Sequence, residues 1–148
     1  MQIRRANIND IPLVADLFDQ YRVWYKKETD MEGAVKFLTA RLEKQESIIF
    51  IAENKDQQFT GFTQLYPIFS STRMKRLWLL NDLFVHPNYR GQGISKMLIE
   101  AAKQHCRETD GCGVLLETGI DNDIGNQLYP RTGFELNTAT NYYEWTCD

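Results

Sequence analysis

A loop with the sequence RGQGISK, residues 90–96, carries the residue types that bind phosphate. Gly91 and Gly93 allow the backbone to approach a bulky anion, because glycine has no Cβ. An amphipathic pattern follows directly and predicts a helix N-terminus, whose free N–H groups and partial positive charge attract anions. Arg90 would add a fixed positive charge. We therefore predict a phosphate site whose backbone donors are Gly91, Gln92, Gly93, Ile94, Ser95 and Lys96.

Two known phosphate motifs do not fit this loop. A dinucleotide-binding fingerprint needs glycine three positions after Gly93, where Lys96 stands, and no Gly-Lys-Ser/Thr marks a P-loop. A tight strand-to-helix turn without any ligand is the alternative interpretation, since glycine-rich turns are common.

Asn81 and Asp82 interrupt an otherwise apolar segment, RLWLLNDLFV. A buried carboxylate is unfavourable unless it is paired or functional. Asp82 could anchor an ammonium group and take its proton, directly or through water. A structural Asp82 that is hydrogen-bonded to a neighbouring loop is the alternative. In a regular strand the two side chains would point to opposite faces, so only one would lie at the reacting group.

Two further groups of residues have suggestive spacing. Asn122 and Tyr129 are seven residues apart, two helical turns, and can face the same cleft. Tyr21, Trp24 and Tyr25 could frame a cation with their ring faces. Ordinary packing in the core is the alternative for all these aromatic residues.

The elements that would position these residues follow from periodicity. Helical spacing predicts a helix from a cap at Asn9 or Asp10, a second from near Asp30, a third over residues 93–108 and a short fourth over 122–133. In the third we expect Ile94, Met97, Leu98, Ala101 and Ala102 to face inward. Strands are expected over 1–6, 47–53, 59–69, 76–85, 113–118 and 139–146, with an extra one possible at 134–136 and an end or bulge at Pro67. This order predicts a mixed α/β (α+β) sheet.

The composition limits the function classes. A chain of 148 residues without a linker suits one domain, residues 1–148. A net charge of −3 argues against a nucleic-acid partner, and no apolar run suggests a membrane or a signal peptide, so we expect a cytoplasmic protein. Three scattered cysteines and two histidines predict neither a disulfide framework nor a metal site.

Two motifs resemble those of the Gcn5-related N-acetyltransferase (GNAT) family. YRGQGIS is similar to the family's pyrophosphate-binding pattern, with Arg90, Gly93 and Ser95 on its marked positions. NDIGNQLYPRTGF resembles its second signature, with Asn122, Leu128, Tyr129, Gly133 and Phe134 in place and Gly125 where alanine is usual. Ser95 also replaces a glycine or alanine. The resemblance covers nearly the whole chain, because the order of elements also matches.

The resemblance implies a fold, a donor and roles for the residues. It implies a mostly antiparallel sheet of six to seven strands with splayed fourth and fifth strands, about four helices, and acetyl-CoA with its pyrophosphate on the loop at Arg90. Tyr129 would protonate the departing thiolate and Asn122 would bind the pantetheine arm. The backbone of Leu83, Phe84 and Val85 would pair with that arm. The first two helices would cover the acceptor side, where Tyr21, Tyr25 and Asn81 would bind the acceptor.

The acceptor is less defined than the donor. Asn81-Asp82-Leu83 is similar to a segment of the yeast Hpa-type histone and polyamine acetyltransferases, and the wider stretch resembles diamine acetyltransferases. We expect a small, cationic primary amine, a polyamine or amino-acid derivative, to attack directly in a ternary complex. A protein lysine or N-terminus, an aminoglycoside-like drug, and a non-catalytic acyl-CoA sensor remain alternatives. A homodimer also remains open.

Overall fold

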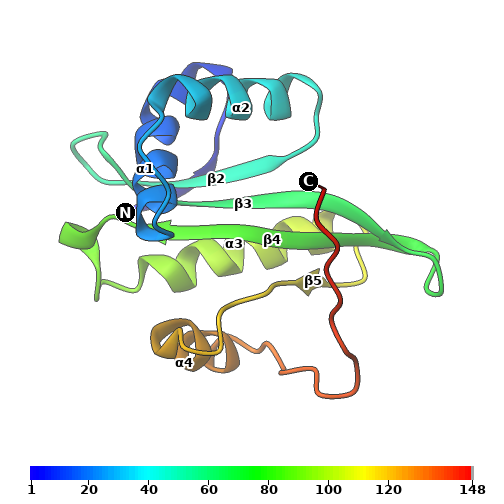
Figure 1. The fold of residues 1–148 in the computed structure, drawn as a ribbon. Coiled ribbons are helices and arrows are strands. Elements are labelled where there is room, and N and C mark those ends of the chain that lie inside the picture. Colours follow the sequence, from blue (N-terminus) through cyan, green and yellow to red (C-terminus); the bar gives the residue numbers. More distant parts are fainter. Residues whose placement is uncertain (148) are drawn as a thin grey trace. The chain divides into compact units, whose positions relative to one another are not determined.

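A computed structural model describes residues 1–147 (Figure 1). The chain forms two compact units, Met1–Glu117 and Thr118–Asp148, and each is described by itself. Of the helices in residues 1–147, none combines the length and the apolar character that crossing a bilayer requires.

The first unit contains one five-stranded sheet in the order β1-β2-β3-β4-β5. Its strands are β1 (Gln2–Arg5), β2 (Ile48–Glu53), β3 (Phe59–Ser70), β4 (Lys75–Val85) and β5 (Val114–Leu115). The first three pairs are antiparallel and β4 pairs with β5 in parallel. The predicted mixed, mostly antiparallel sheet is confirmed, but it has five strands where six to seven were expected.

Helices cover both faces of this sheet (Figure 1). α1 (Ile11–Trp24) and α2 (Met31–Glu43) share a core with Ile49, Ile51, Phe62 and Phe84. α3 (Ile94–Glu108) packs on the other face against Phe50, Ala52, Leu83 and Val85. These two sets alternate along β2 and β4, because successive side chains of a strand point to opposite faces.

The start of α1 agrees with the prediction in position, because Asp10 is its N-cap residue, but the capping hydrogen bond lies elsewhere. Asn7 caps a short 3-10 helix, η1 (Ile8–Asp10), that precedes α1. The Asn7 side chain accepts a hydrogen bond from the Asn9 amide at 2.9 Å. Asp10 precedes α1 but makes no capping bond to it. Its carboxylate instead accepts from the Asn7 amide at 2.8 Å and from Arg4 at 2.8 and 2.9 Å. The cap of α2 at Asp30 agrees with the expected start.

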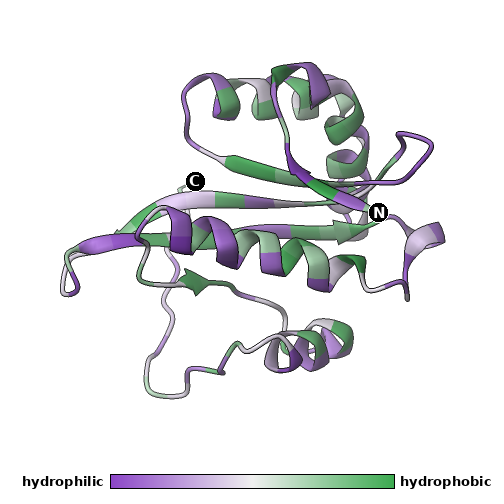
Figure 2. Ribbon diagram, turned by 180° about the vertical axis from the view of Figure 1, so that it is seen from behind, coloured by the Kyte–Doolittle hydropathy of each residue, from purple (hydrophilic) through white to green (hydrophobic). Residues whose placement is uncertain are grey.

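The buried side of α3 is also rotated from the predicted one. Ile94, Leu98, Ile99, Ala102 and Cys106 are buried, whereas Met97 is 37% exposed and Ala101 is half-buried. Figure 2 shows the hydrophilic and hydrophobic residues alternating around this helix. Sequence spacing alone does not distinguish Met97 from Ile99, because both neighbour the apolar stripe.

Pro67 does not end or distort β3. It lies opposite Trp78 in an uninterrupted part of the ladder with β4. The irregularity lies between Gln64 and Leu65, whose partners are Asp82 and Leu80, so that Asn81 is the extra residue of a β-bulge. The prediction at Pro67 was therefore wrong, and the bulge lies in the segment with the polar pair.

The second unit contains α4 (Asp123–Arg131) and no strand in residues 118–147. The strands expected at 134–136 and 139–146 are absent, and Tyr142, Tyr143 and Trp145 are at least 70% exposed. The predicted strand at 113–118 shortens to the two residues of β5, of which Leu115 is half exposed. An alternating pattern alone does not form a strand, because a strand also needs a neighbouring strand with which it shares a ladder of hydrogen bonds.

Candidate active site

The loop between β4 and α3 is open and has left-handed backbone at two positions. After β4 come a 3-10 turn, η2 (Pro87–Tyr89), and two glycines, Gly91 and Gly93, both with a φ of +77°. This left-handed conformation costs other residues about 1–2 kcal/mol. A Cβ added to either glycine would meet no atom within 4 Å. The glycines therefore serve the backbone conformation and leave the space above the loop free.

The donors that the sequence predicts are available in this loop. Among residues 1–147, no protein group accepts a hydrogen bond from the backbone amides of residues 91–96. The first amide at the start of α3 that has a partner is that of Met97, which donates to the Gly93 carbonyl at 3.2 Å. Ile94 is buried and anchors the start of α3, while Lys96 is exposed. Free amides over open space fit the pyrophosphate of a coenzyme.

Arg90 points away from these amides. Its Nε donates to the Val85 carbonyl at 3.1 Å. Its guanidinium carbon lies 5.0 Å from the centroid of the Trp24 ring and 5.9 Å from that of Phe84. Arg90 thus connects the loop to the end of α1, and its side chain must turn before it can contact an anion on the loop.

The end of β4 has one unpaired edge. Pairing with β5 stops at Leu79, and within residues 1–147 no other strand takes its place. The His86 amide donates to the Thr60 carbonyl at 2.9 Å, so the backbone groups of His86 and, by alternation, Phe84 face β3. Those of Leu83 and Val85 consequently face the open edge. Two of the three residues predicted to pair with pantetheine thus have the required orientation.

The bulge brings Asn81 and Asp82 together. Asn81 is exposed and its Nδ2 donates to Asp82 Oδ1 at 3.1 Å. Asp82 is 3% exposed, and its Oδ2 accepts from Gln64 Nε2 at 2.7 Å. We expected opposite orientations because a regular strand alternates its side chains. A bulge adds one residue and redirects a side chain, so the two polar groups meet.

Asp82 has neutral partners only. In the part of the chain that the structure describes, it forms no ion pair with Lys or Arg. Burial raises the pKa of the Asp82 carboxyl, and hydrogen bonds from Gln64, Tyr21 and Asn81 only partly oppose this. Burial also raises the pKa values of Tyr21 and Tyr66, and the charge of Asp82 raises them further, so both hydroxyls keep their protons.

The predicted acceptor residues lie around this carboxylate. The Tyr21 hydroxyl donates to the Asn81 carbonyl at 3.4 Å, and the Tyr21 ring lies edge-on to Tyr25, with 4.9 Å between centroids. Tyr25 is 53% exposed. The structure therefore brings Tyr21 and Asn81 to Asp82, and Tyr25 to Tyr21. We did not single out Gln64, although a lone glutamine in the apolar strand FTGFTQLYPIF was a comparable signal.

The remaining predicted residues belong to the second unit. Asn122 is the N-cap of α4: its Oδ1 accepts from the Gly125 amide at 3.1 Å and its Nδ2 donates to Thr118 Oγ1 at 2.8 Å. A Cβ on Gly125 would lie 2.7 Å from this Nδ2, which accounts for glycine in place of alanine. Tyr129 is half-buried and packs edge-on against Phe134, with 5.9 Å between centroids.

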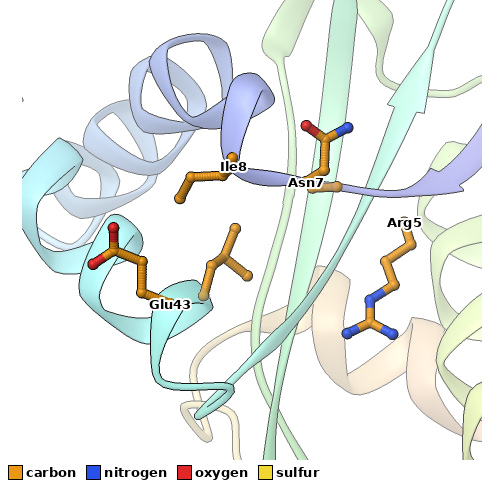
Figure 3. A pocket seen from close by; sticks show the side chains of 6 residues that line it. Arg5, Asn7, Ile8 and Glu43 are labelled. Carbon is orange, nitrogen blue, oxygen red and sulfur yellow. The ribbon is translucent and has the colours of Figure 1, made fainter.

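A separate hollow of about 650 Å³ lies at the end of β1 (Figure 3). It is lined by Arg5, Ala6, Asn7, Ile8, Leu42 and Glu43. Its two charged side chains, Arg5 and Glu43, are exposed, and none of the predicted site residues lines it. The candidate active site is therefore the region of β4, the loop and the end of α1.

The chain is similar to known proteins in both sequence and fold. The model of the Acetyltransferase (GNAT) family matches residues 13–134. The uncharacterized N-acetyltransferase YhfO of Bacillus subtilis is 44% identical over 97% of this chain and 95% of that protein. A probable acetyltransferase of Haemophilus influenzae is 29% identical over 97% of both chains. The crystal structure of a probable acetyltransferase superimposes with a TM-score of 0.95 at 35% identity, over 100% of this chain and 99% of the other. The chain belongs to the GNAT family and is an N-acetyltransferase, and acetyl-CoA is the acyl donor of this family.

Proposed function

We propose that the protein transfers the acetyl group of acetyl-CoA to a primary amine of a small, cationic acceptor, a polyamine or an amino-acid derivative. The observation that carries this proposal is Asp82, a buried carboxylate that has only neutral partners. Burying a charge without a counter-ion is unfavourable, and an acceptor ammonium would supply that counter-ion. The aromatic rings of Tyr21 and Tyr25 next to it would favour a cation further.

Asp82 would also act as the base. Aliphatic amines titrate near about 10, so the acceptor must lose a proton before it can attack. Burial raises the pKa of Asp82, which makes this carboxylate a better proton acceptor than an exposed one. Because Asp82 is 3% exposed, we propose that the proton reaches it through a bridging group, the Tyr21 hydroxyl or a water, beside Asn81.

The donor side follows from the loop and the open edge of β4. Acetyl-CoA would supply the acyl group as a thioester. We propose that the amides of residues 91–96 hold its pyrophosphate, with Arg90 turned toward it, and that Leu83 and Val85 pair with the pantetheine amides like an added strand. Asn122 would contact the same arm, and Tyr129 would protonate the departing thiolate.

The fold alone does not define the acceptor. Solved structures with this fold include an aminoglycoside acetyltransferase from a soil metagenome, with a TM-score of 0.85 at 22% identity, and a ribosomal-protein-alanine N-acetyltransferase from Brucella melitensis, with 0.79 at 18%. The likeness of residues 81–83 to the Hpa-type enzymes supports a polyamine. We also propose a cytoplasmic enzyme without a nucleic-acid or membrane partner. The net charge of −3 supports the absence of a nucleic-acid partner.

An acceptor panel tests this function by release of free thiol from acetyl-CoA. The panel contains diamines, polyamines, amino-acid amides, a lysine-containing peptide with a free N-terminus, and an aminoglycoside. We expect saturation with small diamines, and a much weaker response to 4-aminobutanol than to 1,4-diaminobutane, which differs from it by one charged nitrogen. Equal use of this matched pair would show that a second ammonium group is not recognised and would argue against a polyamine. Coenzyme binding without thiol release for the whole panel would favour an acyl-CoA sensor.

A further inference from the structure

Gln64 of β3 is the most buried partner of Asp82. Its side chain is fully buried, and Nε2 lies 2.7 Å from Asp82 Oδ2 and 3.1 Å from the Tyr66 hydroxyl. Its Oε1 is also buried, and no group in residues 1–147 donates to it. A buried amide oxygen without a partner is costly, so packing alone does not explain a glutamine at this position.

A half-turn of the Gln64 amide exchanges Nε2 and Oε1. In the present orientation the nitrogen donates to an ionised Asp82. In the turned orientation the oxygen would accept from the O–H of a protonated Asp82 and from the Tyr66 hydroxyl, because both distances suit either direction of donation. Each protonation state of Asp82 therefore has a matching orientation of one amide.

The other groups around Asp82 do not serve in this way. Asn81 is exposed and Tyr21 is only partly buried, so an acceptor or solvent competes for their hydrogen bonds. α1 also brings Tyr25 near Tyr21, and α2 brings the charge of Arg41 near Tyr66, but neither residue hydrogen-bonds to Asp82. Gln64 alone approaches the carboxyl from the fully buried side of β3, among the residues that the structure describes.

We propose that Gln64 is a positioning residue that turns its side-chain amide to hold Asp82 first as the carboxylate and then as the acid formed when Asp82 takes the acceptor's proton. This inference rests on the proposed role of Asp82 as the base. The ammonium N–H bond breaks, its electron pair stays on nitrogen and forms the C–N bond, and the C–S pair leaves with sulfur. The acylated nitrogen then loses a second proton as the amide forms, and the thiolate gains one, so that one proton is released overall. The first proton forms an O–H bond on Asp82, directly or through the bridging group, and later returns to solvent.

A methionine variant tests the proposal, because Gln64→Met keeps an unbranched side chain of similar length and removes both the donor and the acceptor. The variant loses the hydrogen bond to the carboxylate and the one to the acid, and the first is the stronger of the two. The acid limb of the kcat/KM profile should therefore move upward by about 1 pH unit, and kcat should fall. Thr63→Val is the matched control. Thr63 Oγ1 donates to the Asp82 backbone carbonyl at 2.8 Å, so this variant also loses a buried hydrogen bond to residue 82 but leaves the carboxyl untouched. It should lower stability without moving the limb.

A measurement on the wild-type protein keeps the test independent of whether the variants fold. In an NMR titration, the side-chain NH₂ signals of Gln64 should change with the same midpoint as the carboxyl carbon of Asp82. A Gln64 signal that does not follow Asp82, or an acid limb of Gln64→Met that coincides with that of the wild type, would overturn the proposal. Asp82→Asn separates this failure from failure of the proposed function. Full activity and an unchanged limb in Asp82→Asn would remove Asp82 as the base, whereas an inactive Asp82→Asn with an unaffected Gln64→Met would remove only the role of Gln64.

Discussion

Replacing Gly93 by valine separates the cost of folding the loop from the cost of binding the coenzyme. In the free protein a Cβ at this position would meet no atom within 4 Å, so the substitution adds strain but no clash with a neighbouring group. The strain of a left-handed residue at φ +77° is about 1–2 kcal/mol. For a chain of about this size, each kcal/mol lowers Tm by roughly 2–4 °C. We therefore expect a folded variant whose Tm falls by roughly 2–8 °C.

Coenzyme binding should fall far more than stability. The valine side chain would occupy the space through which a phosphate reaches the amides, and a hydrogen bond to a charged group contributes about 1.5–3 kcal/mol. Loss of two such bonds costs about 3–6 kcal/mol, which corresponds to roughly 10²–10⁴-fold weaker binding. Isothermal titration calorimetry with coenzyme A and thermal unfolding of the same samples measure the two effects.

Gly93→Asn provides the matched control, because asparagine adopts positive φ more readily than valine but also has a Cβ. Its Tm should lie closer to that of the wild type, while coenzyme binding stays weak. If Gly93→Val bound the coenzyme within a few-fold of the wild type, the pyrophosphate would not lie over this loop. Coenzyme binding that fell in proportion to Tm across the wild type, Gly93→Asn and Gly93→Val would also refute this reasoning. Backbone strain alone would then explain both losses, without a side chain that blocks the phosphate.

Three further substitutions test other parts of the site. Tyr129→Phe should lower kcat by about 10²–10⁴-fold with little change in the Kd of coenzyme A, and an unchanged kcat would remove Tyr129 as the acid. Asp82→Asn should stabilise the protein at pH 8 but not near pH 4. Because the pKa of the Asp82 carboxyl is raised in the folded state, the wild type loses stability as pH rises through that pKa. The Tm of the variant minus that of the wild type should therefore increase with pH. A pH-independent difference would contradict the buried, cation-free environment. Trp24→Leu should tighten coenzyme A binding about 2–5-fold, because an exposed cation–π contact of about 0.5–1 kcal/mol now holds the Arg90 guanidinium at the Trp24 ring and away from the loop amides. Weaker binding would show that Trp24 instead orients Arg90 for the ligand.

Local patterns were sufficient to predict much of this protein. The order of helices and strands follows from periodicities of 3.6 and 2, which depend on neighbours in the sequence. The loop at residues 90–96 could also be predicted from its own sequence, because left-handed backbone before a helix favours glycine, as at Gly91 and Gly93. Both motifs of the family lie in such local segments, so the resemblance could identify the family and the donor without a structure.

Tertiary contacts decided the features that depend on distant residues. The segment 139–146 alternates like a strand but forms none, because a strand also needs a partner strand, which alternation alone does not supply. Asn81 and Asp82 meet because the register between β3 and β4 shifts by one residue, and register is a property of two strands together.

The environment of the catalytic candidate likewise comes from several elements. Gln64 reaches Asp82 across the sheet and Tyr21 reaches Asn81 from α1, over separations of 18 and 60 residues. The sequence determined which side chains could do the chemistry, because chemical type is local. Only the tertiary structure decided which of them share a buried site, because burial and hydrogen bonding depend on segments that are far apart in the chain.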